Sequence, residues 1–535
     1  MSLRLGELRV GKVDGKHEYL QPLTDRDHIA FDAFLIPESV QPERMNNGDV
    51  VFIEGFRGTG KTSLLRWHAE QQQKEGAVTD FVLFKTDLTE AQRLHISKEV
   101  GISWTDVEPS KMELSQDFKD AWTWFILHKI GENIRSCDDL VDDSTGLGGK
   151  ATRLLGLHDD SIFVKAIGFM PKLDGASIKI KADLPFFEAE LGGDFSKSGS
   201  HGQTTLNALN QKILKNLASI KFKRPFYLYF DELEAFYHSP EQHKRDLRMV
   251  RDLIFAVGSI NDMFRKSRSA VNVLAAVRSE VIDAMGSLGQ EVDRLVHDRG
   301  FLISWHHANR SLHHPLIQII KGKITASERA AGVEPCDDPI QVYFPAKVND
   351  FTVEQFLLDR SFYKPRDIVW RLSIAQKLFP NQAKFTVDVL HETETEYSAK
   401  LWEEVRYELS ATYSDDEIDA VESVISGGPD AFELSQIQLQ FEHSARHSIV
   451  LVDLLKRKSV REILSDLYRL GAVGNSYRMG TTGSVVQNRW AFRGDTSLLA
   501  ERRMVIHPAL LKRLSVVSKR RRGTRGARER DQNTR

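Results

Sequence analysis

The chain has few cysteines and no long apolar run, and both absences exclude classes of protein. Cys137 and Cys336 are the only cysteines in 535 residues, too few for a disulfide framework, and they lack the spacing of a metal site. No apolar run approaches the length that spans a bilayer, and the first seven residues contain no apolar signal core. We therefore expect a protein of a reducing compartment, the cytoplasm, without a membrane partner.

An excess of either charge is also missing from the chain as a whole. The formal net charge is −2 at pH 7, so there is no global attraction to nucleic acid. The charge is nevertheless uneven, because residues 519–535 contain eight Lys or Arg against two acidic residues. This segment is poor in apolar residues and predicts a disordered basic tail. It would add affinity for nucleic acid, serve as a nuclear signal, or only keep the protein in solution.

A glycine-rich stretch after a short apolar strand is the first positive signal. Residues 49–54 predict the strand, and residues 55–62 fit the phosphate-loop pattern Gly-x4-Gly-Lys-[Ser/Thr]. Glycines let successive backbone N–H groups turn toward phosphate oxygens, and the positive end of the next helix faces the same place. Lys61 can reach the β- and γ-phosphates, and the Thr62 hydroxyl can bind Mg²⁺. The alternative is a glycine turn without a ligand. The predicted phosphate-binding residues are Gly55, Phe56, Arg57, Gly58, Thr59, Gly60, Lys61, Thr62 and Ser63.

A second apolar strand ends in two carboxylates. Residues 225–230 are almost entirely apolar or aromatic, and Asp231 and Glu232 follow them directly. If this strand runs parallel to the first, Asp231 comes close to a Mg²⁺ ion bound at Thr62 and can hold a metal-bound water. Glu232 is then placed to polarise the attacking water. A purely structural strand end is the alternative explanation of the pair.

Together these strands resemble the additional-strand, catalytic-glutamate class of P-loop ATPases, which includes the AAA+ and STAND families. A third apolar strand, residues 271–277, ends in Arg278. AAA+ proteins have a polar sensor here, often Asn or Thr, whereas STAND-like relatives often have an arginine that reaches the γ-phosphate. Arg278 matches the second pattern and departs from the first, and a strand-end ion pair would also explain it. The blocks Phe-Asp-Glu, Ala-Val-Arg-Ser-Glu and Pro-Arg-Asp also resemble those of a bacterial P-loop ATPase family.

Two further landmarks are similar to the layout of replication-initiator ATPases of the Orc/Cdc6-like kind. Arg366 follows a proline at the start of a predicted helix, and the resemblance implies a second sensor that detects the γ-phosphate. A capped surface helix is the alternative. Arg294 and Arg299 lie in the interval from which AAA+ proteins supply arginine fingers to a neighbouring subunit, although a solvated helix face also explains them. The resemblance covers roughly residues 30–400, except 138–205.

These signals predict an α/β fold with a three-layer P-loop core, a parallel sheet, a helical lid and a C-terminal winged-helix-like domain. Within an insertion, residues 177–183 and 186–191 predict a hairpin that is either a decorative edge or a partner-binding or pore element. The expected domains are a lead-in at 1–48, the ATPase core at 49–320 with the insertion at 138–205, the lid at 321–400, the helical and winged-helix-like domain at 401–514, and the basic tail at 515–535.

The C-terminal region resembles a winged helix because predicted helices end at Leu-Gly and two strand-like pieces follow, at 472–478 and 486–493. Such domains place their last helix in the major groove of DNA. Here the would-be recognition helix, at 459–471, has two arginines and two acidic residues, which is unfavourable for phosphate contact. DNA binding and an intramolecular or protein-contact role therefore both stay open. The candidate nucleic-acid contacts are Arg478, Arg489 and Arg493 of the hairpin and Arg520, Arg521 and Arg522 of the tail.

The predicted activity is slow, Mg²⁺-dependent hydrolysis of ATP, coupled to conformational change. ATP is favoured over GTP because no Asn-Lys-x-Asp guanine-recognition block is present. The predicted catalytic residues are Glu232, Lys61, Arg278 and Arg366, with Thr62 and Asp231 organising Mg²⁺. One use of this activity is a DNA-associated AAA+-like machine. The other is a STAND-like switch, for example in stress or phage defence, in which ATP controls self-assembly or a partner protein.

Overall fold

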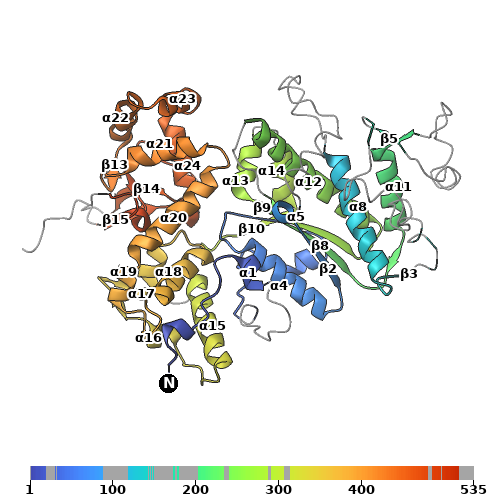
Figure 1. Cartoon of the computed structure of the whole chain (residues 1–535), viewed down its shortest axis with the longest axis horizontal. Coiled ribbons are helices and arrows are strands. Elements are labelled where there is room, and N and C mark those ends of the chain that lie inside the picture. The colour runs from blue at the N-terminus through green and yellow to red at the C-terminus, as the bar shows by residue number, and fades with distance from the viewer. Residues whose placement is uncertain are drawn as a thin grey trace, which may run out of the picture. The chain divides into compact units, whose positions relative to one another are not determined.

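In a computed structural model, the chain forms two compact units (Figure 1). Unit 1 comprises Met1–Asp14, Pro22–Leu35 and Trp305–Arg535, and unit 2 comprises Gly15–Gln21 and Ile36–Ser304. The structure describes residues 2–19, 31, 33–87, 118–142, 144, 146, 149, 173–174, 177–179, 203–233, 240–286, 291–306, 314–479, 485–495 and 497–516.

The centre of unit 2 is a parallel sheet of five strands in the order β10-β1-β9-β8-β2. The predicted α/β class and parallel sheet are confirmed. Strand β9 lies between β1, which leads into the glycine-rich loop, and β8, which carries the two carboxylates. Because all the strands are parallel, their carboxyl ends meet at one edge, where ligands bind in such folds. The strands are β1 (Phe52–Gly55), β2 (Val78–Leu83), β8 (Phe226–Leu233), β9 (Val271–Arg278) and β10 (Gly300–Leu302).

Helices cover both faces of this sheet (Figure 1). Helix α4 (Lys61–Lys74) packs on one face, and α12 (Pro240–Lys266) packs on the other with α8 (Lys119–Ser136) against it. The sheet is apolar on both faces for this reason, and every residue from Phe226 to Phe230 is buried. Further helices of unit 2 are α1 (Gly15–Tyr19), α3 (Pro42–Asn46), α5 (Phe84–Asp87), α11 (Leu206–Ala218), α13 (Ser279–Met285) and α14 (Glu291–Asp298).

Short strands lie within and after residues 138–205, the region predicted to be an insertion. Strand β5 (Ser177–Lys179) pairs antiparallel with β4 (Leu173–Asp174) and with β6 (Gln203–Thr205), and β3 (Val141–Asp142) pairs with β7 (Lys221–Phe222). The predicted partner strand at 186–191 lies outside the described residues.

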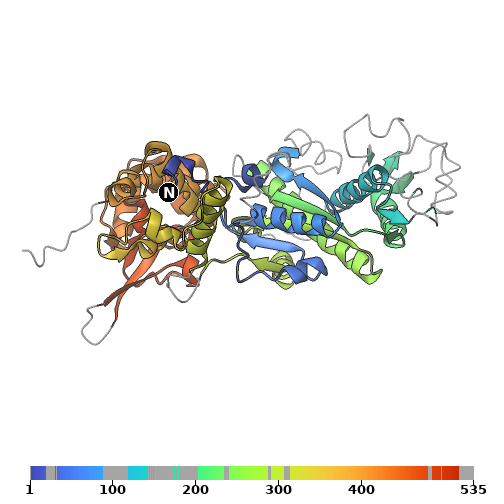
Figure 2. The same ribbon diagram turned by 90° about the horizontal axis from the view of Figure 1, so that it is seen from below.

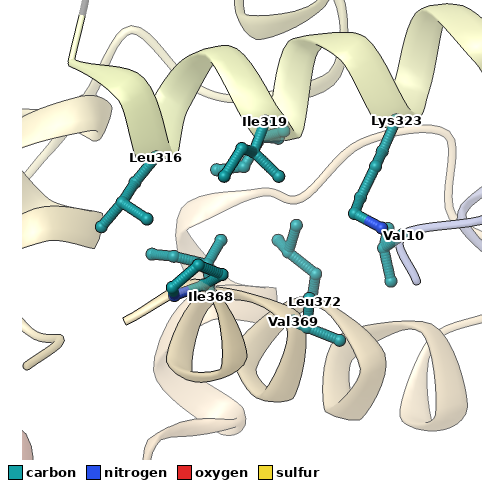
Figure 3. A pocket seen from close by; sticks show the side chains of 9 residues that line it. Val10, Leu316, Ile319, Lys323, Ile368, Val369 and Leu372 are labelled. Atoms are coloured by element: carbon teal, nitrogen blue, oxygen red, sulfur yellow. The ribbon is translucent and has the colours of Figure 1, made fainter. Parts of the chain in front are cut away.

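Unit 1 is mainly helical. Helix α15 (Pro315–Ala330) faces α18 (Pro365–Leu378) across a small apolar pocket, with Leu316 and Ile319 pointing toward Ile368 and Leu372 (Figure 3). The other helices are η1 (Leu5–Glu7), α16 (Pro339–Tyr343), α17 (Val353–Asp359), α19 (Val387–Glu392), α20 (Glu394–Leu409), α21 (Asp415–Ile425), α22 (Leu434–Ala445), α23 (Ile449–Arg457), α24 (Val460–Arg469), η3 (Ala491–Arg493) and η4 (Pro508–Leu510).

Two small sheets complete unit 1. Strands β11 (Lys347–Val348) and β12 (Phe351–Thr352) pair, and a sheet of four strands has the order β13-β16-β14-β15. Its strands are β13 (Ala431–Phe432), β14 (Val473–Met479), β15 (Val485–Arg489) and β16 (Met504–Ile506). The antiparallel hairpin of β14 and β15 projects from the helices of this unit (Figure 2, red). Among the helices that the structure describes, none has the length and apolarity to cross a membrane.

Candidate functional site

The glycine-rich loop adopts a backbone that requires its glycines. Gly58 and Gly60 have φ values of +79° and +97°, in the left-handed region that side chains other than glycine rarely enter. At Gly55 the requirement is space, because an added Cβ would lie 2.6 Å from the Thr59 hydroxyl. The loop is therefore tightly curled between β1 and α4, as the motif predicts.

The first turn of α4 follows the glycine-rich loop directly. No side chain caps it, and it contains no acidic residue. The N–H groups at a helix start lack partners within the helix, and together with the helix dipole they form a favourable place for phosphate. Lys61, which begins the helix, is 9% exposed, and its ammonium group donates to the carbonyls of Gly55 at 2.7 Å and Phe56 at 3.0 Å. The lysine is thus folded over the loop.

The carboxylate that ends the apolar part of β8 has the environment of a metal ligand. Asp231 is 3% exposed, and its Oδ1 accepts a hydrogen bond of 2.8 Å from the backbone N–H of Glu232. Its Oδ2 is buried without a hydrogen-bond partner in the part of the chain that the structure describes. An orphaned buried carboxylate oxygen is costly unless a ligand completes it. The orphaned oxygen of Asp231 therefore fits Mg²⁺, which typically takes one or two protein ligands plus phosphates and water. The Thr62 hydroxyl, in the first turn of α4, is the second candidate ligand.

Glu232 has a strained backbone and a well-defined side chain. Its φ is +60°, unusual for a residue with a Cβ, and the β8–β9 register is irregular between Phe230 and Leu233. One carboxylate oxygen accepts from the Thr86 hydroxyl at 3.0 Å, and the other is 3.5 Å from the ammonium group of Lys16. Thr86 follows β2, and Lys16 belongs to α1. The partly exposed ion pair contributes only about 0–1 kcal/mol, so its effect is on orientation more than on stability.

Arg278 ends β9 directly beside the loop, since it pairs in register with Gly55. Its guanidinium group lies 3.4 Å from Glu280, so the strand-end ion pair is present at this position. The next residue, Ser279, donates a hydrogen bond of 2.8 Å to Glu54 at the end of β1. Burial raises the pKa of Glu54, and the Ser279 hydrogen bond opposes that rise. This bond ties the loop strand to the Arg278 strand.

Arg66 of α4 adds positive charge behind the two carboxylates. Burial lowers the pKa of its guanidinium group, while Asp231, Asp87 and Glu232 all act to raise it. The guanidinium carbon lies 3.5 Å from the centre of the Phe81 ring, which holds the side chain against β2. Arg66 therefore offsets part of the negative charge that β8 brings to this edge.

The finger candidates lie elsewhere in unit 2. Arg294 is exposed on α14, with Asp298 at 3.7 Å. Arg299 contacts Asp262 at 2.5 Å and the carbonyls of Gly48 and Asp49 at 2.9 and 3.1 Å. Gly48 and Asp49 precede β1, so Arg299 lies at the opposite edge of the sheet from the loop. A finger role toward a neighbouring subunit stays a prediction for both.

The remaining candidates lie in unit 1. Arg366 begins α18 and contacts Glu404 and the carbonyl of Val13, each at 3.0 Å. In the hairpin region, Arg489 pairs with Asp495, and Arg493 pairs with Asp359 at 2.7 Å. Arg478 lies on β14, but its side chain is outside the described part of the structure, as are Arg520, Arg521 and Arg522.

Sequence reasoning missed four residues at this edge of the sheet: Lys16, Glu54, Thr86 and Ser279. Three of them follow or end the strands β1, β2 and β9, so the rule that parallel strands end at one edge could have found them. Lys16 had no such signal, because it comes from the polar lead-in. Its helix lies against α4, since a Cβ at Gly15 would be 2.7 Å from the Ser63 hydroxyl.

In comparisons with known proteins, no family model and no curated protein matches the chain.

Proposed function

We propose that unit 2 binds ATP with Mg²⁺ and hydrolyses it by attack of water on the γ-phosphate. The observation that carries the proposal is the shared edge of the sheet. The curled loop, the uncapped start of α4, Arg278 and the pair Asp231–Glu232 all come to it from parallel strands or the helix after β1. The position of β9 between β1 and β8 further supports the additional-strand class of P-loop ATPases.

Each group has one role in this proposal. The loop N–H groups and Lys61 hold the β- and γ-phosphates. Thr62 and Asp231 would hold Mg²⁺, which would supply positive charge to the phosphate oxygens. Glu232 orients the attacking water and accepts its proton. Arg278 lies one strand away from the loop, where it can exchange its Glu280 partner for the γ-phosphate.

The use of the hydrolysis is proposed as conformational change in either of two settings. A DNA-associated AAA+-like machine requires basic side chains available to phosphates, which a winged-helix-like domain would supply. Arg489 and Arg493 are instead paired with aspartates of unit 1. This observation favours the second setting, a STAND-like switch in which ATP controls self-assembly or a partner protein.

The test is the steady-state ATPase rate, with and without duplex DNA, at two salt concentrations. We expect Lys61→Ala to lose nucleotide binding, and Glu232→Gln to bind ATP but lose hydrolysis by about 10²-fold or more. Wild-type rates in both variants would contradict the site. A salt-sensitive rise with DNA supports the DNA machine. Indifference to DNA, with a larger ATP-bound assembly of Glu232→Gln, supports the switch.

A further inference from the structure

Helix α1 brings a lysine to the proposed water-activating carboxylate from the N-terminal lead-in. Lys16 lies 3.5 Å from Glu232 and donates a hydrogen bond of 2.9 Å to the Thr86 hydroxyl. Thr86 in turn donates to the other oxygen of Glu232 at 3.0 Å. The three side chains therefore close a triangle whose members come from α1, α5 and β8.

The triangle restrains Glu232, whose backbone conformation is unfavourable. At φ +60° the Glu232 backbone is strained, so contacts around it must hold this conformation. Both carboxylate oxygens are engaged, yet an ionised carboxylate has about four acceptor positions, so each oxygen keeps room for a water. The side chains of Lys16 and Glu232 are 18% and 22% exposed, so the pair is shielded without being sealed from solvent.

The placement of α1 supports a role at this site. A Cβ at Gly15 would lie 2.7 Å from the Ser63 hydroxyl and 3.6 Å from the Thr62 Cβ, so α1 is packed on the first turn of α4. The lysine after this contact is thereby held between the first turn of α4 and Glu232. A flexible exposed lysine would lack this anchoring.

We propose that Lys16 is a positioning residue for Glu232. It holds the carboxylate, together with Thr86, in the orientation that accepts a proton from water attacking the γ-phosphate. This inference rests on the proposed ATPase function and adds to it a residue outside the phosphate loop and the strand ends.

The experiment compares Lys16→Met, Lys16→Arg and the control Lys12→Met, which changes an exposed lysine of the same N-terminal segment. We expect Lys16→Met to lower kcat about tenfold, a part of the roughly 10²–10⁴-fold effect of a positioned base, with KM changed less than about twofold. Lys16→Arg should restore most of the rate, because a guanidinium group can make the same contacts. Lys12→Met should keep wild-type kcat, and equilibrium ATP binding should be similar in all three variants.

A double-variant cycle tests whether Lys16 acts through Glu232. In a Glu232→Gln background, Lys16→Met should cause no further loss of kcat, because the carboxylate that it positions is already gone. An unchanged or raised kcat in Lys16→Met, or an additional tenfold loss in the double variant, would overturn the inference while leaving the ATPase proposal intact. Wild-type rates in Lys61→Ala and Glu232→Gln, or a wild-type protein without hydrolysis, would instead overturn both.

Discussion

The charged groups of unit 1 are arranged differently from those at the edge of the unit 2 sheet that carries the glycine-rich loop. In unit 1 several charged side chains are closely paired: Lys364 contacts Glu408 at 2.6 Å, Arg366 contacts Glu404 at 3.0 Å, and Arg493 contacts Asp359 at 2.7 Å. The Nε of Arg493 is nevertheless buried without a hydrogen-bond partner among the described residues. At the loop edge of unit 2, by contrast, Asp231 has an orphaned oxygen and α4 has an uncapped start. Orphaned polar atoms occur in both units, but at this edge one lies at the same end of the sheet as a curled glycine loop and a helix start, and this combination is suited to a ligand.

The largest expected effect is on the paired charges of unit 1. Lys364 and Glu408 have side chains that are 8% and 1% exposed. Lys364→Met would leave Glu408 buried without this cation, and we expect the free energy of unfolding of unit 1 to fall by about 3–5 kcal/mol. Hydrogen exchange of the α20 amides, measured by mass spectrometry, would report the loss of stability in unit 1 independently of unit 2.

The control for Lys364→Met is Lys456→Met, which removes an exposed partner of Asp453. It should change stability by less than about 0.5 kcal/mol. Equal protection of α20 in wild type and Lys364→Met would show that the buried pairs of unit 1 do not hold its fold.

The two units should also differ in the sign of their response to pH. Burial lowers the pKa of His68, between Tyr229 and Asn46, to about 4. Below about pH 6.5 the unfolded chain binds a proton at this histidine and the folded chain does not, so acidification to pH 4 destabilises unit 2 by roughly 3 kcal/mol. Chemical unfolding between pH 4 and 7 measures this, and His68→Gln should flatten the dependence.

Asp367 in unit 1 gives the opposite contribution. Burial raises the pKa of Asp367 to about 6, so the folded state binds its proton more tightly than the unfolded state. Its contribution to stability is complete at low pH and is lost as pH rises through 6. The stability of Asp367→Asn relative to wild type should therefore increase between pH 4 and 7. A decrease in its relative stability over this range would contradict the assignment.

A substitution in the glycine-rich loop should have a smaller effect on stability and a large effect on ATP binding. Gly60 has φ +97° and open space around it, so Gly60→Ala costs about 1–2 kcal/mol of backbone strain without a clash. Gly332→Ala is the matched control in unit 1, with φ +70° and open space. Calorimetry should show similar destabilisation in both, and only Gly60→Ala should weaken ATP binding, by about tenfold or more.

The smallest effect on stability is expected for Asp231→Asn. The substitution keeps the Oδ1 acceptor for the Glu232 N–H and replaces an oxygen that has no partner among the described residues. We expect the melting temperature to change by less than about 2 °C, or to rise, while Mg²⁺ no longer strengthens ATP binding. A large loss of stability with intact Mg²⁺ dependence would show that Asp231 is structural.

Much of the candidate site follows from local sequence. The glycine spacing at 55–60 predicts the curled loop, because only that pattern fits two left-handed backbones and a close contact in six residues. The apolar run before Asp231 predicts a strand buried on both faces. The sequence allowed two roles for Arg278, a contact with the γ-phosphate or a strand-end ion pair. The structure places Arg278 near both Glu280 and the loop, so it is compatible with either role.

The sequence alone determined that a curled glycine-rich loop and a carboxylate-ended strand exist, since these depend on residues next to one another in the chain. Only the tertiary structure decided their neighbours. Three features join segments that are distant in the chain: the position of β9 between β1 and β8, the contact of Lys16 with Glu232, and the pairing of Arg366 and Arg493 with acidic residues. Such pairings depend on which surfaces meet when the core closes, and no local pattern encodes them.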